Sequence, residues 1–265
     1  MNSATINGMD IAYQTAGEGT PLVLLHGFIH DSRTWQRQIE DFSRDFDVIA
    51  WDAPGCGQSS DPPEEFSMAE FAECLGGLLD AIGVSATHLL GLSWGGALAL
   101  EFYRRRPDAV LSLILADSYA GWTGSLGPEA AEQRLARCLH ESTLAPEAWI
   151  PQWVPHAFSG NASQDLLEEQ ASQMWDFHPV GFRAMSRAVT PDFGDVLPTI
   201  DVPTLLIWGD DDQRSPLSAA KMMRDQIPGA RLVVIPSAGH LSNMEQPVQF
   251  NAAVREFLQS IDAHG

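Results

Sequence analysis

The residue best placed to act as a nucleophile is Ser93, which lies in a Gly-x-Ser-x-Gly pattern at positions 91–95. An apolar run at 87–92, typical of a buried strand, leads into this pattern, and a helical pattern begins directly after it at Trp94. A serine on a tight strand-to-helix turn presents its hydroxyl at the edge of a sheet, and the flanking glycines let the strand and the helix approach closely. We therefore predict that Ser93 is a catalytic nucleophile rather than a solvated serine in a glycine-rich turn.

A serine hydroxyl is a weak nucleophile and needs a base, for which His240 is the best candidate. This histidine follows an apolar run at 231–235 and precedes the last helical pattern, so it belongs at the same sheet edge as Ser93. The other seven of the eight histidines lack that placement. We expect His240 to act as the base rather than as a loop residue that caps the last helix.

The base in turn needs a carboxylate to orient it. Three consecutive acids follow the apolar run at 204–208, namely Asp210, Asp211 and Asp212. Acids in turns are usually solvated, so at least two of these three are expected to face water. Their position in the chain does not decide which of them contacts the base.

The elements that would position these residues alternate between strand-like and helix-like patterns at both ends of the chain. Short apolar runs indicate strands buried on both faces, at 21–25, 46–51, 87–92, 111–116, 204–208 and 231–235. Helical patterns lie between them, at about 34–44, 68–82, 94–106, 217–226 and 245–261. This alternation predicts an α/β fold with a doubly wound, mostly parallel sheet. The spacing of Ser242 and Glu245 predicts a capping box at the start of the last helix.

The alternation stops between residues 119 and 196, where the patterns are helical and are separated by proline and glycine. We interpret residues 1–118 and 197–265 as the core domain and residues 119–196 as a helical cap, or lid, inserted between two strands. Half of the eight tryptophans lie in this cap, and we expect them to wall the substrate pocket: Trp122, Trp149, Trp153 and Trp175. The alternative is that they fill the interior of the cap itself.

The composition excludes several classes of partner. The 265 residues carry a formal net charge of −20, which repels the phosphates of nucleic acids and anionic lipid surfaces. The first residues lack the pattern of a signal peptide, and no apolar stretch approaches the length of a membrane span, so we expect a cytoplasmic protein.

Neither a disulfide framework nor a metal site is expected. The three cysteines, Cys56, Cys74 and Cys138, have no Cys-x-x-Cys spacing. The histidines His26 and His30 have a spacing that suits a metal on a helix, but they lie in a loop after a predicted strand. We therefore expect no metal and no organic cofactor.

Several of these segments resemble the α/β-hydrolase family. The stretch Gly-Asp-Asp-Asp-Gln-Arg-Ser-Pro at 209–216 is similar to the Gly-x-x-Asp…Pro loop whose last acid belongs to the family's catalytic triad, which favours Asp212. The chain order Ser93, Asp212, His240 is also the order of the family. Asp117, at the end of another predicted strand, is the acid that some members use instead.

Two further segments carry the same resemblance. The stretch His-Gly-Phe at 26–28 is similar to the family's oxyanion loop, which implies that the backbone N–H groups of Phe28 and Trp94 form the oxyanion hole. The stretch at 52–59 is similar to the family's Asp-x-x-Gly-x-Gly-x-Ser loop, which we interpret as structural. In all, the resemblance covers residues 21–117 and 200–258, and the cap lies outside it.

Within the family, the nucleophile identifies the type of chemistry. A serine at position 93 excludes the dehalogenases and epoxide hydrolases, which use aspartate. The segment 91–96 also resembles proline iminopeptidases, but those enzymes have His-Gly-Gly-Pro-Gly where this chain has His-Gly-Phe-Ile-His at 26–30. The segment 239–247 is similar to 3-oxoadipate enol-lactonases and their carboxylesterase relatives. Carbon–carbon bond hydrolases and cofactor-free haloperoxidases share the same scaffold.

The resemblance implies a serine hydrolase that cleaves a carboxylic ester or a lactone through an acyl-enzyme. The alternatives are a carbon–carbon bond hydrolase, an amidase similar to proline iminopeptidases, and a ligand receptor with an intact triad and very slow turnover. We also expect a neutral substrate, because the cap cations Arg183 and Arg187 point away from the apolar face of their predicted helix. The strong negative charge of the chain favours the same expectation.

Overall fold

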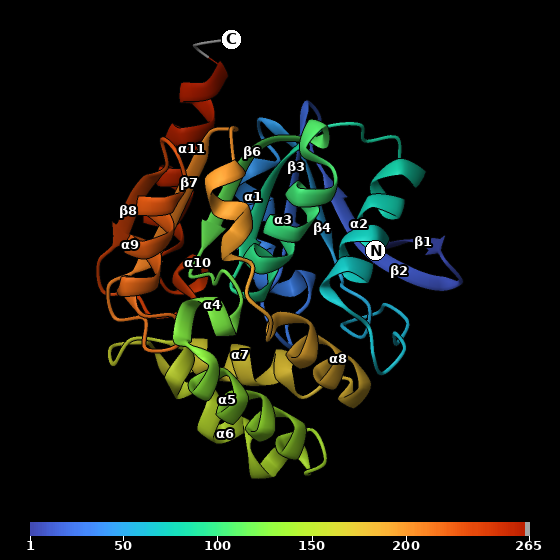
Figure 1. Ribbon diagram of the computed structural model, residues 1–265, viewed down its shortest axis with the longest axis vertical. Helices are drawn as coiled ribbons and strands as arrows, with labels where there is room; N and C mark the ends of the chain where they lie inside the picture. The colour runs from blue at the N-terminus through green and yellow to red at the C-terminus, as the bar shows by residue number, and fades with distance from the viewer. Residues whose placement is uncertain (263–265) are drawn as a thin grey trace.

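The computed structural model describes residues 1–262 and contains one eight-stranded sheet with the order β1-β2-β4-β3-β5-β6-β7-β8 (Figure 1). Its six parallel strands are the six apolar runs: β3 (Thr20–Leu25), β4 (Phe46–Trp51), β5 (Thr87–Leu92), β6 (Val110–Ala116), β7 (Thr204–Gly209) and β8 (Arg231–Ile235). Helices α1 (Gln36–Phe42) and α11 (Pro247–Asp262) pack together on one face, and α2 (Met68–Ala81), α3 (Trp94–Arg105) and α9 (Leu217–Gln226) cover the other. The predicted doubly wound α/β fold is confirmed.

The first two strands were not predicted from the sequence. Strands β1 (Asn2–Ile6) and β2 (Met9–Ala16) form an antiparallel hairpin, and β2 also pairs antiparallel with β4. The hairpin turn consists of Asn7 and Gly8, whose φ angles are 51° and 82°, as a two-residue type I′ turn requires. These strands are only partly buried, so they lack the continuous apolar run that marks the central strands.

Five α-helices lie between β6 and β7 and group at one end of the sheet (Figure 1). They are α4 (Trp122–Leu126), α5 (Pro128–Glu141), α6 (Ile150–Trp153), α7 (Gln164–Met174) and α8 (Pro179–Val189). We refer to residues 119–196 as the cap. An ion pair between Arg37 of α1 and Glu169 of α7, with 2.7 Å between the charged atoms, is one of the links between the cap and the core.

The predicted capping box at the last helix is wrong. Residues 242–245 form a separate short helix, α10 (Ser242–Glu245), ahead of α11. The Ser242 hydroxyl bonds Asp117, while the Glu245 carboxylate accepts hydrogen bonds from the N–H groups of Gly239 at 2.8 Å and Ser159 at 3.0 Å. Both side chains therefore serve contacts between distant segments, which local spacing cannot reveal.

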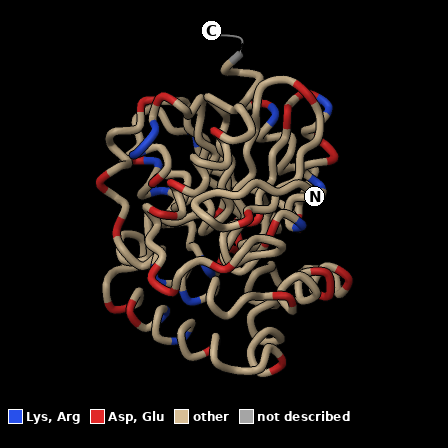
Figure 2. Tube along the Cα trace, turned by 90° about the vertical axis from the view of Figure 1, so that its right-hand side faces the viewer, with Lys and Arg blue, Asp and Glu red and all other residues tan. Residues whose placement is uncertain are grey.

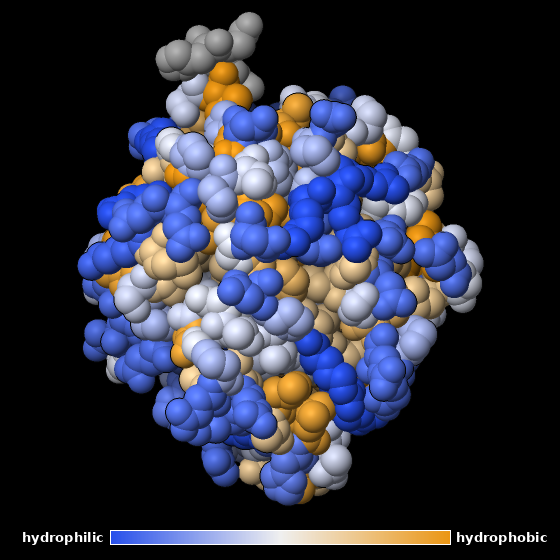
Figure 3. All heavy atoms as spheres, viewed as in Figure 1, coloured by the Kyte–Doolittle hydropathy of each residue, from blue (hydrophilic) through white to orange (hydrophobic). Residues whose placement is uncertain are grey.

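Acidic residues are spread along both the core and the cap, as the red segments of Figure 2 show. The face seen in Figure 3 is mostly hydrophilic, with hydrophobic residues in small separate groups. Among the residues that the structure describes, no helix combines the length and the apolar character needed to cross a membrane. The cysteines Cys56, Cys74 and Cys138 are buried and free.

Candidate active site

Ser93 lies between β5 and α3 with φ 53° and ψ −112°, a conformation that side-chain-bearing residues seldom adopt. Such strain costs roughly 1–3 kcal/mol and persists only where the surrounding structure enforces it. Here the enforcement comes from close packing. A Cβ atom on Gly91 would lie 2.3 Å from the carbonyl oxygen of Gly95, and one on Gly95 would lie 2.2 Å from that of Leu25. The two glycines of the pattern are therefore required by contact between backbones.

A continuous chain of hydrogen bonds joins the three predicted triad residues. The Ser93 Oγ is 2.8 Å from Nε2 of His240, and Nδ1 of His240 is 2.8 Å from Oδ2 of Asp212. The other oxygen of Asp212 accepts hydrogen bonds from the backbone N–H groups of Arg214 at 2.8 Å and Ser215 at 2.9 Å. The side chains of His240 and Asp212 are 5% and 0% exposed, so water does not compete for these contacts.

The loops that carry the acid and the base pack directly against each other. They follow the neighbouring strands β7 and β8, and the N–H of Asp211 donates to the carbonyl of Ala238 at 2.9 Å. A Cβ atom on Gly209 would lie 2.2 Å from the carbonyl oxygen of Gly239, so this approach needs a glycine. Because β7 and β8 are neighbours in the sheet, Asp212 and His240 lie side by side although they are far apart in sequence.

Asp117, the alternative acid, lies beneath the triad and has different contacts. One of its oxygens accepts a hydrogen bond from the N–H of Gly209 at 2.8 Å, and the other bonds the Ser242 hydroxyl. Burial, followed by the nearby charge of Asp212, raises the pKa of Asp117 well above its usual range. Of the candidate acids, Asp212 is the one that contacts His240.

The other two acids of the turn behave as turn acids usually do. Asp210 and Asp211 are exposed, and Asp210 accepts a hydrogen bond from the N–H of Ala238 at 3.3 Å.

The two residues predicted to form the oxyanion hole border the same cavity as Ser93. Phe28 lies in the loop after β3, and Trp94 is the first residue of α3. Within residues 1–262, neither of their backbone N–H groups donates a hydrogen bond to another group. These two donors beside Ser93 are available to an oxyanion, which is the role predicted for them.

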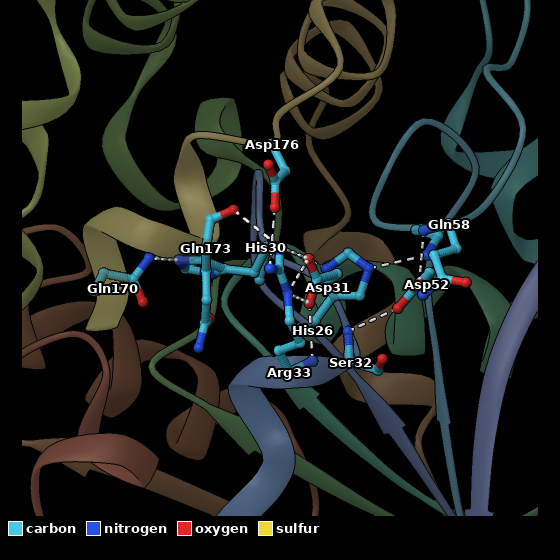
Figure 4. A network of polar contacts seen from close by, with 12 residues as sticks. His26, His30, Asp31, Ser32, Arg33, Asp52, Gln58, Gln170, Gln173 and Asp176 are labelled. Atoms are coloured by element: carbon cyan, nitrogen blue, oxygen red, sulfur yellow. Dashed lines mark hydrogen bonds and ion pairs between the residues drawn. The ribbon is translucent and has the colours of Figure 1, made fainter. Parts of the chain in front are cut away.

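Two buried histidines, His26 and His30, connect the loop after β3 to its surroundings (Figure 4). His26 accepts a hydrogen bond from the N–H of Ala53 at 2.9 Å, and burial lowers its pKa. His30 contacts the side-chain amide of Gln170 in α7, with 2.5 Å between the two nitrogens. Burial is the largest cause that lowers the pKa of His30 to about 3. Both rings are therefore neutral near pH 7 and serve to join loops. Among residues 1–262, no cluster of three or more acids, histidines or cysteines could hold a metal ion.

Ser93 and His240 line a cavity of about 370 Å³ between the core and the cap. Of the four cap tryptophans expected to wall the substrate pocket, Trp122 and Trp153 line this cavity. The expectation is wrong for Trp149, which does not line the cavity and instead stacks on Phe182, with 5.2 Å between the ring centroids. It is also wrong for Trp175, which is 41% exposed just after the end of α7. A helical pattern gives the period of a face but not which neighbour that face contacts, so the sequence could not separate these cases.

Sequence reasoning missed most of the polar lining of the cavity. Apart from Ser93 and His240, the polar residues that line the cavity are Tyr119, Arg134, Arg137, Glu141, Gln152, His156, Gln213 and Arg214. The position of Arg214, two residues after the predicted acid, was a signal that could have been used. The arginines of α5 carried no such signal, because nothing in the sequence shows which face of the cap meets the core.

A mostly parallel sheet with a serine on a strained strand-to-helix turn, and with its acid and base on the loops after later strands, defines the α/β-hydrolase class. The chain belongs to the alpha/beta hydrolase family, whose model matches residues 22–253.

Several known proteins are similar over nearly the whole chain. A thermophilic esterase from Thermogutta terrifontis, solved with malate bound, is 31% identical, with a TM-score of 0.90 and coverage of 98% of each chain. A protein of Pseudomonas savastanoi pv. phaseolicola, provisionally named carbamate hydrolase RutD, is 28% identical over 90% of this chain and 93% of its own. The enol-lactonase of Burkholderia xenovorans LB400 has the same fold, with a TM-score of 0.89 at 24% identity over 97% and 100% of the two chains.

The contacts of the two buried acids predict different outcomes for matched substitutions. Asp212→Asn should lower kcat for an activated ester by roughly 10³- to 10⁴-fold, because the correct tautomer of His240 and the stabilisation of its charged form are lost. Asp117→Asn changes a side chain that contacts Gly209 and Ser242 rather than His240, and it should reduce kcat far less. Steady-state kinetics with melting temperatures for both variants provide the measurement. A larger loss of kcat in the Asp117 variant would show that Asp117, directly after β6, is the acid that orients His240.

The buried neutral state of His30 predicts a loss of stability in acid. The unfolded chain takes up a proton on this histidine below about pH 6.5, whereas the folded chain does so only near pH 3. Between these values each pH unit costs about 1.4 kcal/mol of unfolding free energy. His30→Gln should therefore lose about 2 kcal/mol less than the wild type between pH 7.5 and pH 5, as measured by urea denaturation. Equal losses in the two proteins would contradict the assignment.

The placement of the tryptophans predicts which of them affect acyl-chain preference. Trp122→Ala enlarges the cavity and should raise the ratio of kcat/KM for an octanoyl ester over an acetyl ester by roughly tenfold. Trp175→Ala, on the outer surface, should leave the ratio as it is. The opposite pattern would place the acyl pocket elsewhere.

Proposed function

We propose that this protein is a serine hydrolase that cleaves a carboxylic ester or a lactone through an acyl-enzyme on Ser93. The observation that carries the proposal is the buried chain of hydrogen bonds from Ser93 through His240 to Asp212. This arrangement activates a serine hydroxyl, because the base lies beside the hydroxyl and the orienting acid lies beside the base.

The geometry suggests a role for each group. Nδ1 of His240 donates to Asp212, which leaves Nε2 free to accept the proton of Ser93 as its Oγ attacks the carbonyl carbon. The N–H groups of Phe28 and Trp94 bind the oxygen that becomes negative, and collapse of the tetrahedral intermediate transfers the proton from His240 to the leaving alcohol. A water molecule, deprotonated by His240, then releases the acid and restores Ser93.

The similar proteins support a carbonyl substrate but differ in the bond that is cleaved. The Thermogutta terrifontis protein is named an esterase, and the Pseudomonas savastanoi protein carries the name of a carbamate hydrolase. Esters, lactones and carbamates share the first step, which is attack on an acyl carbon. We favour the ester or lactone because the more similar of these two proteins, at 31% identity, is an esterase.

The main test is substitution of the nucleophile. Ser93→Ala should fold with an unchanged circular dichroism spectrum and lose ester hydrolysis by at least about 10³-fold, because the covalent route is removed. A fluorophosphonate probe should label the wild type and leave the variant unlabelled, and mass spectrometry should locate the adduct on Ser93. Labelling of another serine would overturn the assignment.

A panel of substrates separates the proposal from its alternatives. Multiple turnovers of esters or lactones, with slower hydrolysis of matched amides and of carbon–carbon bonds, are expected. Turnover restricted to amides or to carbon–carbon bonds would replace the ester proposal. Saturable binding without a second turnover would identify a ligand receptor.

A further inference from the structure

Two arginines in this protein differ from all the others. Lysine and arginine together number 15, and Lys221 is the only lysine, so the chain has 14 arginines. Twelve of them form an ion pair with a carboxylate: Arg33, Arg37, Arg44, Arg104, Arg105, Arg106, Arg137, Arg183, Arg187, Arg224, Arg231 and Arg255. Within residues 1–262, the two without such a pair are Arg134 and Arg214, and both line the cavity that contains Ser93.

The guanidinium of Arg214 has no polar partner among the described residues. It lies over the ring of Trp153, with 4.2 Å between the guanidinium carbon and the ring centroid. Burial, together with the charges of Arg134 and Arg137, lowers the pKa of Arg214 to about 10. The side chain is therefore still charged at neutral pH, on an aromatic support that leaves its N–H groups available.

Arg134 approaches the same place from the cap helix α5. Its guanidinium donates to the Tyr119 hydroxyl at 2.9 Å and to the backbone carbonyl of Arg214 at 3.2 Å. The ring of Tyr119 in turn has its centroid 6.2 Å from that of His240. A single aromatic side chain thus separates the Arg134 guanidinium from the catalytic base.

The other charges of the cavity do not compensate this pair. Glu141 forms an ion pair with Arg137, with 4.0 Å between the charged atoms, and accepts a hydrogen bond from Trp153 at 2.9 Å. Asp212 is engaged by His240. The cavity therefore carries an excess of positive charge, although the whole chain has a net charge of −20.

A scarcity of carboxylates cannot explain the unpaired arginines, since the chain contains 35 acidic residues. A partly desolvated cation without a counter-ion is costly, and a guanidinium matches a carboxylate in both geometry and charge. We propose that Arg134 and Arg214 form an anion subsite that binds a carboxylate of the substrate. This rests on the proposed function for the bond that is cleaved: the substrate is a small ester or lactone that also carries a carboxylate.

This proposal replaces the expectation of a neutral substrate. That expectation considered Arg183 and Arg187, and the structure does place both outside the cavity, where they pair with Glu64. The cations that line the cavity come instead from α5 and from the loop after β7. The size of the cavity, about 370 Å³, suits a compact substrate in which only a few bonds separate the carboxylate from the carbonyl that Ser93 attacks.

The first test compares two esters whose acyl groups have the same number of carbon atoms. The probes are the mono-4-nitrophenyl ester of glutaric acid, which carries a carboxylate, and 4-nitrophenyl pentanoate, which is neutral. The wild type should have a kcat/KM at least about tenfold higher for the anionic ester. Arg214→Gln should lower the ratio of anionic to neutral kcat/KM by tenfold or more, and Arg134→Gln should lower it in the same direction.

Arg183→Gln is the matched control, because it removes an arginine that pairs with Glu64 outside the cavity, and it should leave the ratio unchanged. Melting temperatures identify any variant that fails to fold, and Arg214→Gln is the safest of them because its guanidinium has no hydrogen bond to lose. A wild type that prefers the neutral ester, or an equal effect of Arg214→Gln on both esters, would overturn the anion subsite.

The second test is independent of catalysis. Calorimetry with the Ser93→Ala variant should detect binding of glutarate but at least tenfold weaker binding of the neutral diamide, glutaramide. Adding Arg214→Gln should weaken the binding of glutarate by tenfold or more. If glutarate binds in this way while no ester is turned over, the proposed function fails and the subsite stands. If esters are turned over while glutarate and glutaramide bind equally, the subsite fails and the proposed function stands.

Discussion

The site depends on one backbone contact, the approach of the first turn of α3 to the end of β3. Gly95 allows the helix to lie against the carbonyl of Leu25, and Gly91 allows the same helix to lie against β5. With the helix held there, the chain can connect β5 to α3 only through the left-handed conformation of Ser93. The strain is maintained because β5 and the start of α3 are wholly buried, so relaxing the turn would disrupt well-packed neighbours.

The buried Asp117 organises the polar groups beneath this turn. It follows β6 and bonds the N–H of Gly209, which precedes the acid loop, and the hydroxyl of Ser242, which follows the base. Its two carboxyl oxygens therefore contact both loops, while burial and the nearby charge of Asp212 raise the pKa of Asp117 well above its usual range. Asp212 is left as the carboxylate that faces His240.

The cap adds a charge pattern that differs from the rest of the molecule. Elsewhere the arginines form ion pairs with the abundant acids, as Arg37 does with Glu169 between the core and the cap. In the cavity, Arg134 and Arg214 instead contact rings and a backbone carbonyl. The chain has a net charge of −20, yet within residues 1–262 these two arginines have no carboxylate partner, which concentrates positive potential in the cavity beside Ser93.

The sequence by itself determined the central strands, most of their helices and the strand-to-helix setting of Ser93, because continuous apolar runs and glycine spacing are local signals with a direct backbone cause. The choice of Asp212 came from the resemblance of its loop to that of a known family. The edge hairpin also has a local signal, because the Asn7-Gly8 pair is typical of a two-residue turn between antiparallel strands. Only the tertiary structure decided the rest. It determined the pairing of His240 with Asp212, the hydrogen bond from Ser242 to the distant Asp117, and the exposed position of Trp175. The same holds for the cavity lining from α5. These features depend on which surfaces of separate helices and loops meet, and the period of a helix specifies a face without specifying its neighbour.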